Sequence, residues 1–269
     1  MAPHMLNKDT QICISISKSP SNFGTTVHNA GYSALNLNYL YKACEVVDLE
    51  GAITGVRSLG IRGCSVSMPF KEAVIQYVDE LHISASDAGA INSILNTNNY
   101  LVGYNTDVIG ALISLKKIQV TAGEKILILG AGGVAKAILV ALKKIGVRDI
   151  SVASRSVANT NGFNSCEKVS FNSIRKKDFD VIINATPIGM PNNEPKFPFD
   201  FSEIGNVRAV MDVVVTKSQT ELIKWAAKSH KKYVEGSFMS FEQAVSQFEL
   251  YTGNKAPRSI MQAAISNYK

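Results

Sequence analysis

A short apolar strand that runs through a glycine-rich turn into a helix constrains the fold of this chain more than any other feature. Residues 126–135 read ILILGAGGVA, so Gly130, Gly132 and Ala135 fit the pattern G-x-G-x-x-A in the required place. The first glycine permits a tight turn, the second lets the backbone approach a phosphate, and the small third residue lets helix and strand pack closely. The alternative is a glycine-rich turn in a sheet without a ligand. We predict a dinucleotide site at the helix N-terminus, made by Gly130, Ala131, Gly132, Gly133 and Val134.

The end of the next predicted strand distinguishes between two dinucleotides. Ser154 and Arg155 directly follow the apolar run 150–153. A carboxylate there would hold the ribose 2′-hydroxyl of NAD, whereas the Arg155 guanidinium can pair with the 2′-phosphate of NADP. The sequence therefore favours NADP, with Ser154 and Arg155 as cofactor-binding residues. A solvated arginine at a strand end is the alternative.

Strands and helices alternate along most of the 269 residues, which predicts an α/β protein of two domains with mostly parallel sheets. Natural boundaries lie near Asp107 and near Gly236. We expect a hairpin of 91–95 with 100–103, and a helix that Asp48 caps. The other expected strands are 11–15, 38–42, 63–67, 125–129, 150–153, 181–184, 209–214 and 233–234, and the expected helices include 25–35, 48–59, 107–117, 135–145, 219–230, 238–251 and 258–266.

Charge is distributed unevenly along the chain, whose net charge is +6. Residues 1–105 hold 6 basic and 8 acidic side chains (6 − 8 = −2), and residues 106–269 hold 22 and 14 (22 − 14 = +8). The excess positive charge therefore lies in the same part of the chain as the glycine loop. This position favours a polyanionic cofactor over nucleic acid as the binding partner. The alternation of basic and aromatic residues that is typical of single-strand binding is missing.

The cysteines and the apolar stretches exclude other classes of protein. Four scattered cysteines form no CxxC pair, so we predict no zinc site, no metal and no disulfide, but reduced thiols in a cytoplasmic protein. The most apolar stretch, 126–142, contains Lys136 and three glycines, so we predict no membrane span and no membrane partner. We interpret Met1–Met5 (MAPHM) as a remnant of cloning.

Two ionisable residues at the ends of predicted elements are candidate catalytic groups. Lys71 closes the segment SMPFK after a strand and a proline, and Asp107 follows GYNT at the start of a helix. On spacing alone, either residue is more readily an ordinary surface charge.

The order of the motifs around these residues resembles the shikimate dehydrogenase family over nearly the whole chain. Each segment is common by itself, but seven in order are specific. The resembling segments are SMPFK (family V-T-x-P-x-K), AINS at 90–93 (G-A-x-N-T), GYNTD at 103–107 (G-x-N-T-D), GAGGVA, SRS at 154–156 (N-R-T), NATPIGM at 184–190 (N-A-T-x-x-G-M) and 241–253, FEQAVSQFELYTG.

The resemblance implies a role for each matched position. Lys71 is then catalytic and Asp107 orients it, while Ser67, Asn92 and Gln243 bind substrate. Thr186 and Gly236 then join the cofactor-binding residues. The implied domains are 1–106 for substrate, 107–236 as a Rossmann domain for NADP, and 237–269 as helices that pack back on the first domain.

Two segments depart from the family pattern. The family motif S-x-S-P-x-x-H-N holds the substrate carboxylate with its two serines. Aligned without gaps on His28, those positions hold Asn22 and Gly24, followed by Thr25, which we predict to form an altered substrate-binding clamp. SKSP at 17–20 matches the motif only with an insertion.

In the second departure, the family's D-x-x-Y-x-P-x-x-T becomes residues 212–220, with Val215 and Lys217 in place of tyrosine and proline. An exposed loop lysine is the simpler interpretation of Lys217.

The resemblance implies an enzyme that reversibly reduces 3-dehydroshikimate to shikimate with NADPH, in the pathway to chorismate and the aromatic amino acids. Its partners would be small molecules, and it would act as a monomer or homodimer. The altered clamp leaves open a dehydrogenase for quinate or another cyclic hydroxy acid. A regulatory dinucleotide-binding protein without activity is a further alternative, against which the presence of both Lys71 and Asp107 argues.

Overall fold

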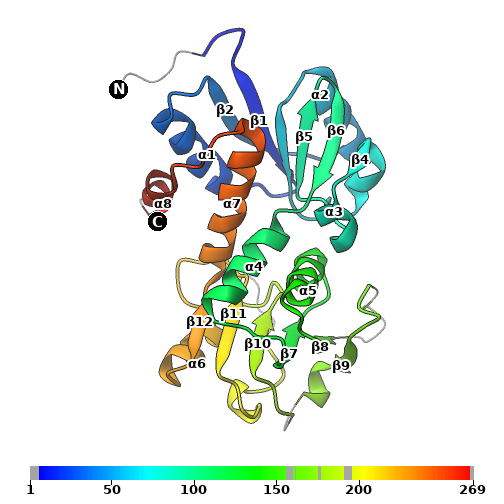
Figure 1. The fold of residues 1–269 in the computed structure, drawn as a ribbon, viewed down its shortest axis with the longest axis vertical. Coiled ribbons are helices and arrows are strands. Elements are labelled where there is room, and N and C mark those ends of the chain that lie inside the picture. Colours follow the sequence, from blue (N-terminus) through cyan, green and yellow to red (C-terminus); the bar gives the residue numbers. More distant parts are fainter. Residues whose placement is uncertain (1–5, 156–159, 161, 175–176, 191–195, 267–269) are drawn as a thin grey trace. The chain divides into compact units, whose positions relative to one another are not determined.

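The computed structural model describes residues 6–155, 160, 162–174, 177–190 and 196–266, which fall into two compact units (Figure 1). Unit 1 comprises 1–106 and 243–269, and unit 2 comprises 107–242. Each unit contains one six-stranded sheet, and the predicted α/β class is confirmed. The change from unit 2 to unit 1 falls inside helix α7 (Gly236–Thr252), later than the predicted boundary after Gly236. The segment Met1–Met5 and Ser156 lie outside the described residues.

The sheet of unit 2 has the strand order of a Rossmann fold. All its pairs are parallel, in the order β9-β8-β7-β10-β11-β12. In chain order this is 3-2-1-4-5-6, and the order reverses between β7 and β10, where such sheets open a ligand crevice at their carboxyl ends. The strands are β7 (Lys125–Leu129), β8 (Asp149–Ser154), β9 (Glu167–Ser170), β10 (Val181–Asn184), β11 (Ala209–Asp212) and β12 (Lys232–Val234).

Both faces of this sheet are covered, which explains why its strands are continuous apolar runs. Ile126 and Ile128 pack on the side of α4 (Asp107–Lys117) and α5 (Gly133–Ile145). Leu127 and Leu129 pack on the opposite side, with α6 (Glu221–Lys228) and the short helices η3 (Phe171–Ser173) and η4 (Phe201–Glu203).

The sheet of unit 1 is mixed, in the order β2-β1-β3-β5-β6-β4. Strand β1 runs parallel to β2 and β3, and β5 runs antiparallel to β3 and β6. The expected hairpin is present, and its turn residues Asn98 and Asn99 have φ of +53° and +66°, which asparagine tolerates well. The strands are β1 (Gln11–Ser17), β2 (Tyr39–Glu45), β3 (Gly63–Val66), β4 (Glu80–Leu81), β5 (Ser93–Thr97) and β6 (Tyr100–Tyr104).

Helices of unit 1 bring distant parts of the chain together. Helix α1 packs against α8, and a Cβ on Gly31 of α1 would lie 2.6 Å from the Phe248 ring of α7. The carboxylate of Asp48 accepts a 3.1 Å hydrogen bond from the Gly51 amide, as expected of an N-cap. The helices are α1 (Phe23–Ala34), α2 (Leu49–Ser58), η1 (Ala73–Tyr77), α3 (Ile83–Ala88) and α8 (Arg258–Ser266). No helix within the described ranges combines the length and apolar character needed to cross a bilayer.

Candidate active site

The glycine loop after β7 is packed tightly on one side and open on the other. Gly130 has a φ of +101°, and a Cβ there would lie 2.9 Å from the carbonyl oxygen of Ala185, so a larger residue would be strained and crowded. Gly132 is exposed, stands at the N-cap of α5 without a side-chain cap, and a Cβ there would meet nothing within 4 Å. The other residues of the loop, Ala131, Gly133 and Val134, are half-buried.

The predicted 2′-phosphate residues lie at the neighbouring strand end. Strand β8 pairs with β7, and the Gly130 amide donates a 2.7 Å hydrogen bond to the carbonyl of Ala153. Ser154 is buried as the last residue of β8, and Arg155 directly after it is exposed. Free helix N–H groups suit a pyrophosphate and an exposed guanidinium suits a further phosphate, so these residues fit NADP.

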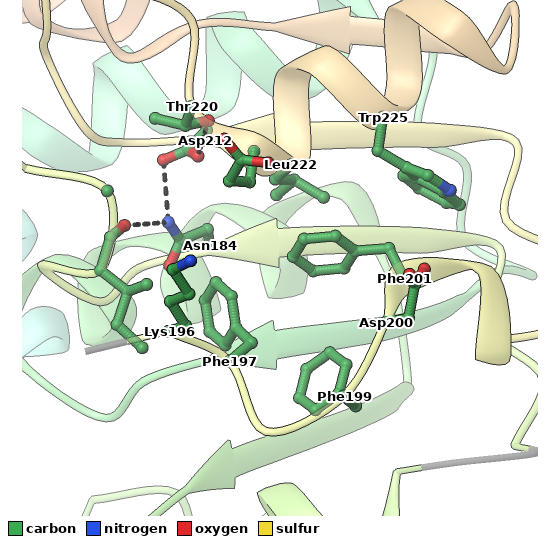
Figure 2. A pocket seen from close by; sticks show the side chains of 13 residues that line it. Asn184, Lys196, Phe197, Phe199, Asp200, Phe201, Asp212, Thr220, Leu222 and Trp225 are labelled. Atoms are coloured by element: carbon green, nitrogen blue, oxygen red, sulfur yellow. Dashed lines mark hydrogen bonds between the residues drawn. The ribbon is translucent and has the colours of Figure 1, made fainter. Parts of the chain in front are cut away.

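A hydrogen-bond network fixes the ends of β10 and β11 at the same edge of the sheet (Figure 2). Asn184 Nδ2 donates to Asp212 Oδ1 (3.0 Å) and to the carbonyl of Ile188 (3.1 Å). Both the amide and the hydroxyl of Thr186 donate to Asn184 Oδ1, at 3.0 and 2.7 Å. Asp212 also accepts from the Thr220 hydroxyl at 2.6 Å and from the Val214 amide at 2.9 Å. Burial raises the pKa of Asp212, and these hydrogen bonds oppose that shift.

This network closes one end of a cavity of about 730 Å³, which we call the aromatic cavity. Figure 2 shows the rings of Phe197, Phe199, Phe201 and Trp225 around it. Phe199 and Phe201 meet edge to face, with centroids 5.7 Å apart. Among its thirteen described lining residues, no buried side-chain nitrogen or oxygen lacks a hydrogen-bond partner. The spacing of the three phenylalanines is the signal of this cavity that is visible in the sequence, although no residue of the aromatic cluster was predicted as a site residue.

Gly236 and the altered segment after β11 lie beside each other in unit 2. A Cβ on Gly236 would lie 2.4 Å from the carbonyl oxygen of Val214, so helix α7 begins in direct contact with this segment. Val215 and Lys217 are both exposed.

Unit 1 contains a smaller cavity of about 180 Å³, which we call the serine cavity. The predicted residues Gly24, Ser67 and Gln243 line it. Asn22 and Thr25 do not: Asn22 is exposed before α1, and the Thr25 hydroxyl accepts a 3.2 Å hydrogen bond from the Ala43 amide. The other lining residues are Ser15, Ser17, Ser19, Pro20, Ser21, Phe23, His28, Tyr41, Ser65, Ala244 and Gln247.

The predicted catalytic residues are fixed by the segments that carry them. The carbonyl of Lys71 accepts a 2.7 Å hydrogen bond from the amide of Ile91, the neighbour of Asn92. Asn92 is fully buried, and its Oδ1 accepts from the Thr106 amide at 2.7 Å. That bond holds the residue directly before Asp107, which is buried as the first residue of α4.

Eleven of the residues that line the serine cavity were not predicted from the sequence, and Ser17, His28 and Gln247 are among them. Gln247 follows Gln243 by four positions, which places both on one face of α7, and this spacing is a usable signal. Ser17 and His28 both fall in the family motif S-x-S-P-x-x-H-N when SKSP at 17–20 is aligned with an insertion, so this motif is the signal that could have found them. Within the described part of the chain, no group of three or more His, Cys, Asp or Glu side chains could hold a metal ion.

Family models match two segments of the chain. Residues 13–94 match the shikimate dehydrogenase substrate binding domain, and residues 239–265 match the shikimate 5'-dehydrogenase C-terminal domain. A shikimate dehydrogenase-like protein of Haemophilus influenzae is 40% identical over 251 residues, which cover 92% of this chain and 93% of that protein. A shikimate dehydrogenase (NADP(+)) of Methanosphaera stadtmanae is 34% identical over 246 residues, 86% of this chain and 87% of that protein.

Solved structures give the same result. A shikimate 5-dehydrogenase-like protein superposes with a TM-score of 0.89 at 38% identity, covering 97% of this chain and 98% of the other. Shikimate 5-dehydrogenase of Thermus thermophilus, solved with NADP(H) and shikimate, superposes with a TM-score of 0.86 at 25% identity. The superposition covers 98% of this chain and 100% of the other. Quinate dehydrogenase of Corynebacterium glutamicum, solved with NAD, superposes with a TM-score of 0.86 at 26% identity. The superposition covers 96% of this chain and 99% of the other. The predicted family is confirmed: the chain belongs to the shikimate dehydrogenase family.

Proposed function

We propose that this chain is an NADP-dependent dehydrogenase that interconverts 3-dehydroshikimate and shikimate. The observation that carries the proposal is the glycine loop with Arg155 at the point where strand order reverses, in a family member that keeps Lys71 and Asp107. Relatives named as NADP(+) enzymes, and the solved relative that holds NADP(H) and shikimate, support it.

The cofactor-binding part of the proposal rests on Gly130 to Val134, Ser154, Arg155, Thr186 and Gly236. The open N-terminus of α5 would hold the pyrophosphate, and the Arg155 guanidinium would hold the 2′-phosphate. Thr186, fixed by Asn184, would shape the edge of the cofactor site. NADPH, when bound, supplies the hydride that reduces the substrate ketone.

The catalytic part of the proposal rests on Lys71 and Asp107. Negative charge develops on the carbonyl oxygen as a ketone is reduced, and the Lys71 ammonium would stabilise this charge and deliver a proton to that oxygen. In the reverse direction the Lys71 amine would take the proton from the alcohol. The Asp107 carboxylate would orient the ammonium, while Ser67, Asn92 and Gln243 would hold the ring substituents.

A second candidate substrate is quinate or another cyclic hydroxy acid. One observation favours it: quinate dehydrogenase is among the solved relatives. In either case the substrate would be a small hydroxylated ring acid, bound by a chain that acts as a monomer or homodimer.

The test is a rate panel in which shikimate or quinate is oxidised with NADP+ or NAD+. We expect shikimate with NADP+ to give the highest kcat/KM. We expect Arg155→Ala to weaken NADPH binding by about 10- to 150-fold, because charge-assisted hydrogen bonds contribute about 1.5–3 kcal/mol, and to leave NADH binding unchanged.

Trp225→Phe in the aromatic cavity is the control and should change neither affinity. Equal losses for NADPH and NADH in Arg155→Ala would remove the argument for 2′-phosphate recognition. A panel without any turnover would contradict the proposed activity.

A further inference from the structure

A chain of hydrogen bonds connects an exposed histidine of unit 1 to the segment directly before Asp107. It starts at His82, which caps helix α3, and passes through the half-buried Ser84. It ends at Asn105, which is 1% exposed and stands two positions before Asp107. We call His82, Ser84 and Asn105 the histidine relay.

The backbone amides in the relay fix which atoms donate and which accept. The Ser84 amide donates to His82 Nδ1 at 3.2 Å, and the Asn105 amide donates to Ser84 Oγ at 3.0 Å. Because an amide N–H can only donate, Nδ1 is the acceptor nitrogen of the ring. The Ser84 hydroxyl lies 2.9 Å from the same nitrogen and therefore donates to it. Two bonds to one ring thus hold Ser84, whose oxygen accepts from Asn105.

Strand β6 holds the first member of the relay in place. The His82 amide donates to the carbonyl of Gly103 at 2.9 Å. The His82 ring stacks on Tyr104, with centroids 4.7 Å apart and an interplanar angle of 26°. Gly103 and Tyr104 are the last two residues of β6, and Asn105 follows them directly. Both ends of the relay therefore depend on the same strand end, which fixes their separation.

Asn105 connects the relay to residues that we propose for catalysis and substrate binding. It is buried, and its Nδ2 donates to the carbonyl of Ala90 at 2.8 Å. The amide of Thr106, the next residue, donates to Asn92 Oδ1 at 2.7 Å. These bonds join the segment around Asn92 to the turn from which Asp107 begins α4. A shift of Asn105 would therefore move this turn.

Ser84 supplies the acceptor for a buried amide. If its hydroxyl were absent, the Asn105 N–H would lose this acceptor inside the protein, where an unpaired donor is costly. If His82 lost its acceptor nitrogen, α3 would lose its cap, and Ser84 would lose both of the bonds that aim its oxygen. Helix α3 has only six residues, so few other bonds hold its first turn.

We propose that Ser84 and His82 are positioning residues for Asp107. Each acts through Asn105 on the turn before α4, so that the Asp107 carboxylate meets the Lys71 ammonium in the orientation that proton transfer needs. This inference rests on the proposed function and deepens it, because it names the residues that set the geometry of the catalytic pair.

Ser84→Ala tests the inner half of the relay. With saturating shikimate and NADP+, kcat should fall about 10-fold, because a small misplacement of a catalytic group is costly. Titration calorimetry should still find NADP+ bound with unchanged affinity and stoichiometry, which shows that the variant is folded. Ser84→Thr keeps the hydroxyl and should restore the rate to within about 2-fold of wild type. Ser86→Ala, which changes an exposed serine of the same helix, is the matched control and should retain the wild-type rate.

His82→Phe tests the outer half of the relay. Phenylalanine keeps a ring that can stack on Tyr104 but has no acceptor nitrogen, so kcat should fall about 3-fold, an effect of the size of one lost helix cap. His82→Asn replaces histidine by a favoured N-cap residue and should stay within about 1.5-fold of wild type.

The double variant with Ser84→Ala and His82→Phe distinguishes a relay from two separate effects. In a relay His82 acts only through Ser84, so the double variant should be as slow as Ser84→Ala alone, about 10-fold below wild type. Two independent contributions would multiply to about 30-fold.

Failure of either half would overturn the inference and leave the proposed function intact. Ser84→Ala at the wild-type rate, or Ser84→Thr as slow as Ser84→Ala, would show that the Ser84 hydroxyl does not position Asp107. His82→Phe at the wild-type rate, or a double variant about 30-fold slower than wild type, would show that His82 does not act through Ser84. Wild-type protein that oxidises neither shikimate nor quinate would contradict the proposed function, and the role of the relay with it.

Discussion

The aromatic cavity of unit 2 is about 730 Å³, and the serine cavity of unit 1 is about 180 Å³. The larger one has its buried polar groups joined in a closed network around Asp212, with no orphan among its described lining residues. In the smaller one, Ser17 Oγ is buried without a hydrogen-bond partner among the described residues, and Gln247 is the side chain that raises the pKa of the buried His28 ring. The larger cavity therefore has its buried polar groups paired within the protein, whereas the smaller cavity contains a buried polar group that is not.

The difference in hydrogen bonding suggests a structural role for the aromatic cavity and a binding role for the serine cavity. Where every buried donor and acceptor is paired within the protein, substitution removes stability and a ligand has little to gain there. Where such groups are unpaired, substitution removes binding and can leave stability untouched. Unsatisfied polar groups therefore support the serine cavity as the proposed substrate site better than cavity volume would.

The largest effect on stability should come from the aromatic cavity. Asp212→Ala removes the acceptor of three buried hydrogen bonds, from Asn184, Thr220 and the Val214 amide. We expect a loss of about 3 kcal/mol or more in the free energy of unfolding, measured with urea, because the donors are left unsatisfied.

Glu221→Gln is the control for this measurement, since Glu221 lines the same cavity but is exposed and, among the described residues, forms an ion pair with Lys224 on the surface. It should cost about 0.5 kcal/mol or less. A loss below about 1 kcal/mol in Asp212→Ala would break the comparison, because the closed network would then contribute no more than a surface pair.

A smaller effect should appear in the pH dependence that His28 gives to unit 1. Its pKa is about 3 in the folded protein and 6.5 ordinarily, so between these values the unfolded state binds more protons and stability falls as pH falls. The stability of wild type relative to His28→Phe should therefore drop by about 2 kcal/mol between pH 7 and pH 5, at about 1.4 kcal/mol per pH unit below 6.5.

Urea unfolding at both pH values measures this difference. The control is His230→Asn, since His230 is exposed and has a φ of +53° that asparagine tolerates. A difference between wild type and His28→Phe that is the same at both pH values would contradict a neutral, buried imidazole in the serine cavity.

Local patterns predicted most of the elements of this fold. The glycine turn after 125–129, the Asp48 cap and the hairpin around Asn98 and Asn99 each depend on nearby residues, so they are visible in the sequence. The elements β4 and α3 span only two and six residues, too short to show a period. The split of α7 between two units depends on packing rather than on any helix-breaking residue.

The site was less accessible to sequence reasoning. The glycine loop at Gly130 carries its chemistry in adjacent residues, whereas Lys71 and Asp107 were predicted as catalytic residues only through the family resemblance. The residues that line the serine cavity come from β1, α1 and α7, and the one motif that joins Ser17 with His28 fits only when an insertion is allowed. The gapless alignment pointed to Asn22 and Thr25, yet the lining of the cavity comes from the serines before them, since β1 continues to Ser17.

The most direct test of the proposed function is the initial rate of NADPH formation from shikimate and NADP+, for wild type and for Lys71→Ala. We predict turnover by wild type and a fall in kcat of about 100-fold or more in Lys71→Ala, because a positioned proton donor contributes about that much. The affinity for NADP+ should be unchanged, and Lys224→Ala on the surface of α6 should retain the wild-type rate. A Lys71→Ala variant at the wild-type rate, or a wild type without turnover, would contradict the proposed function.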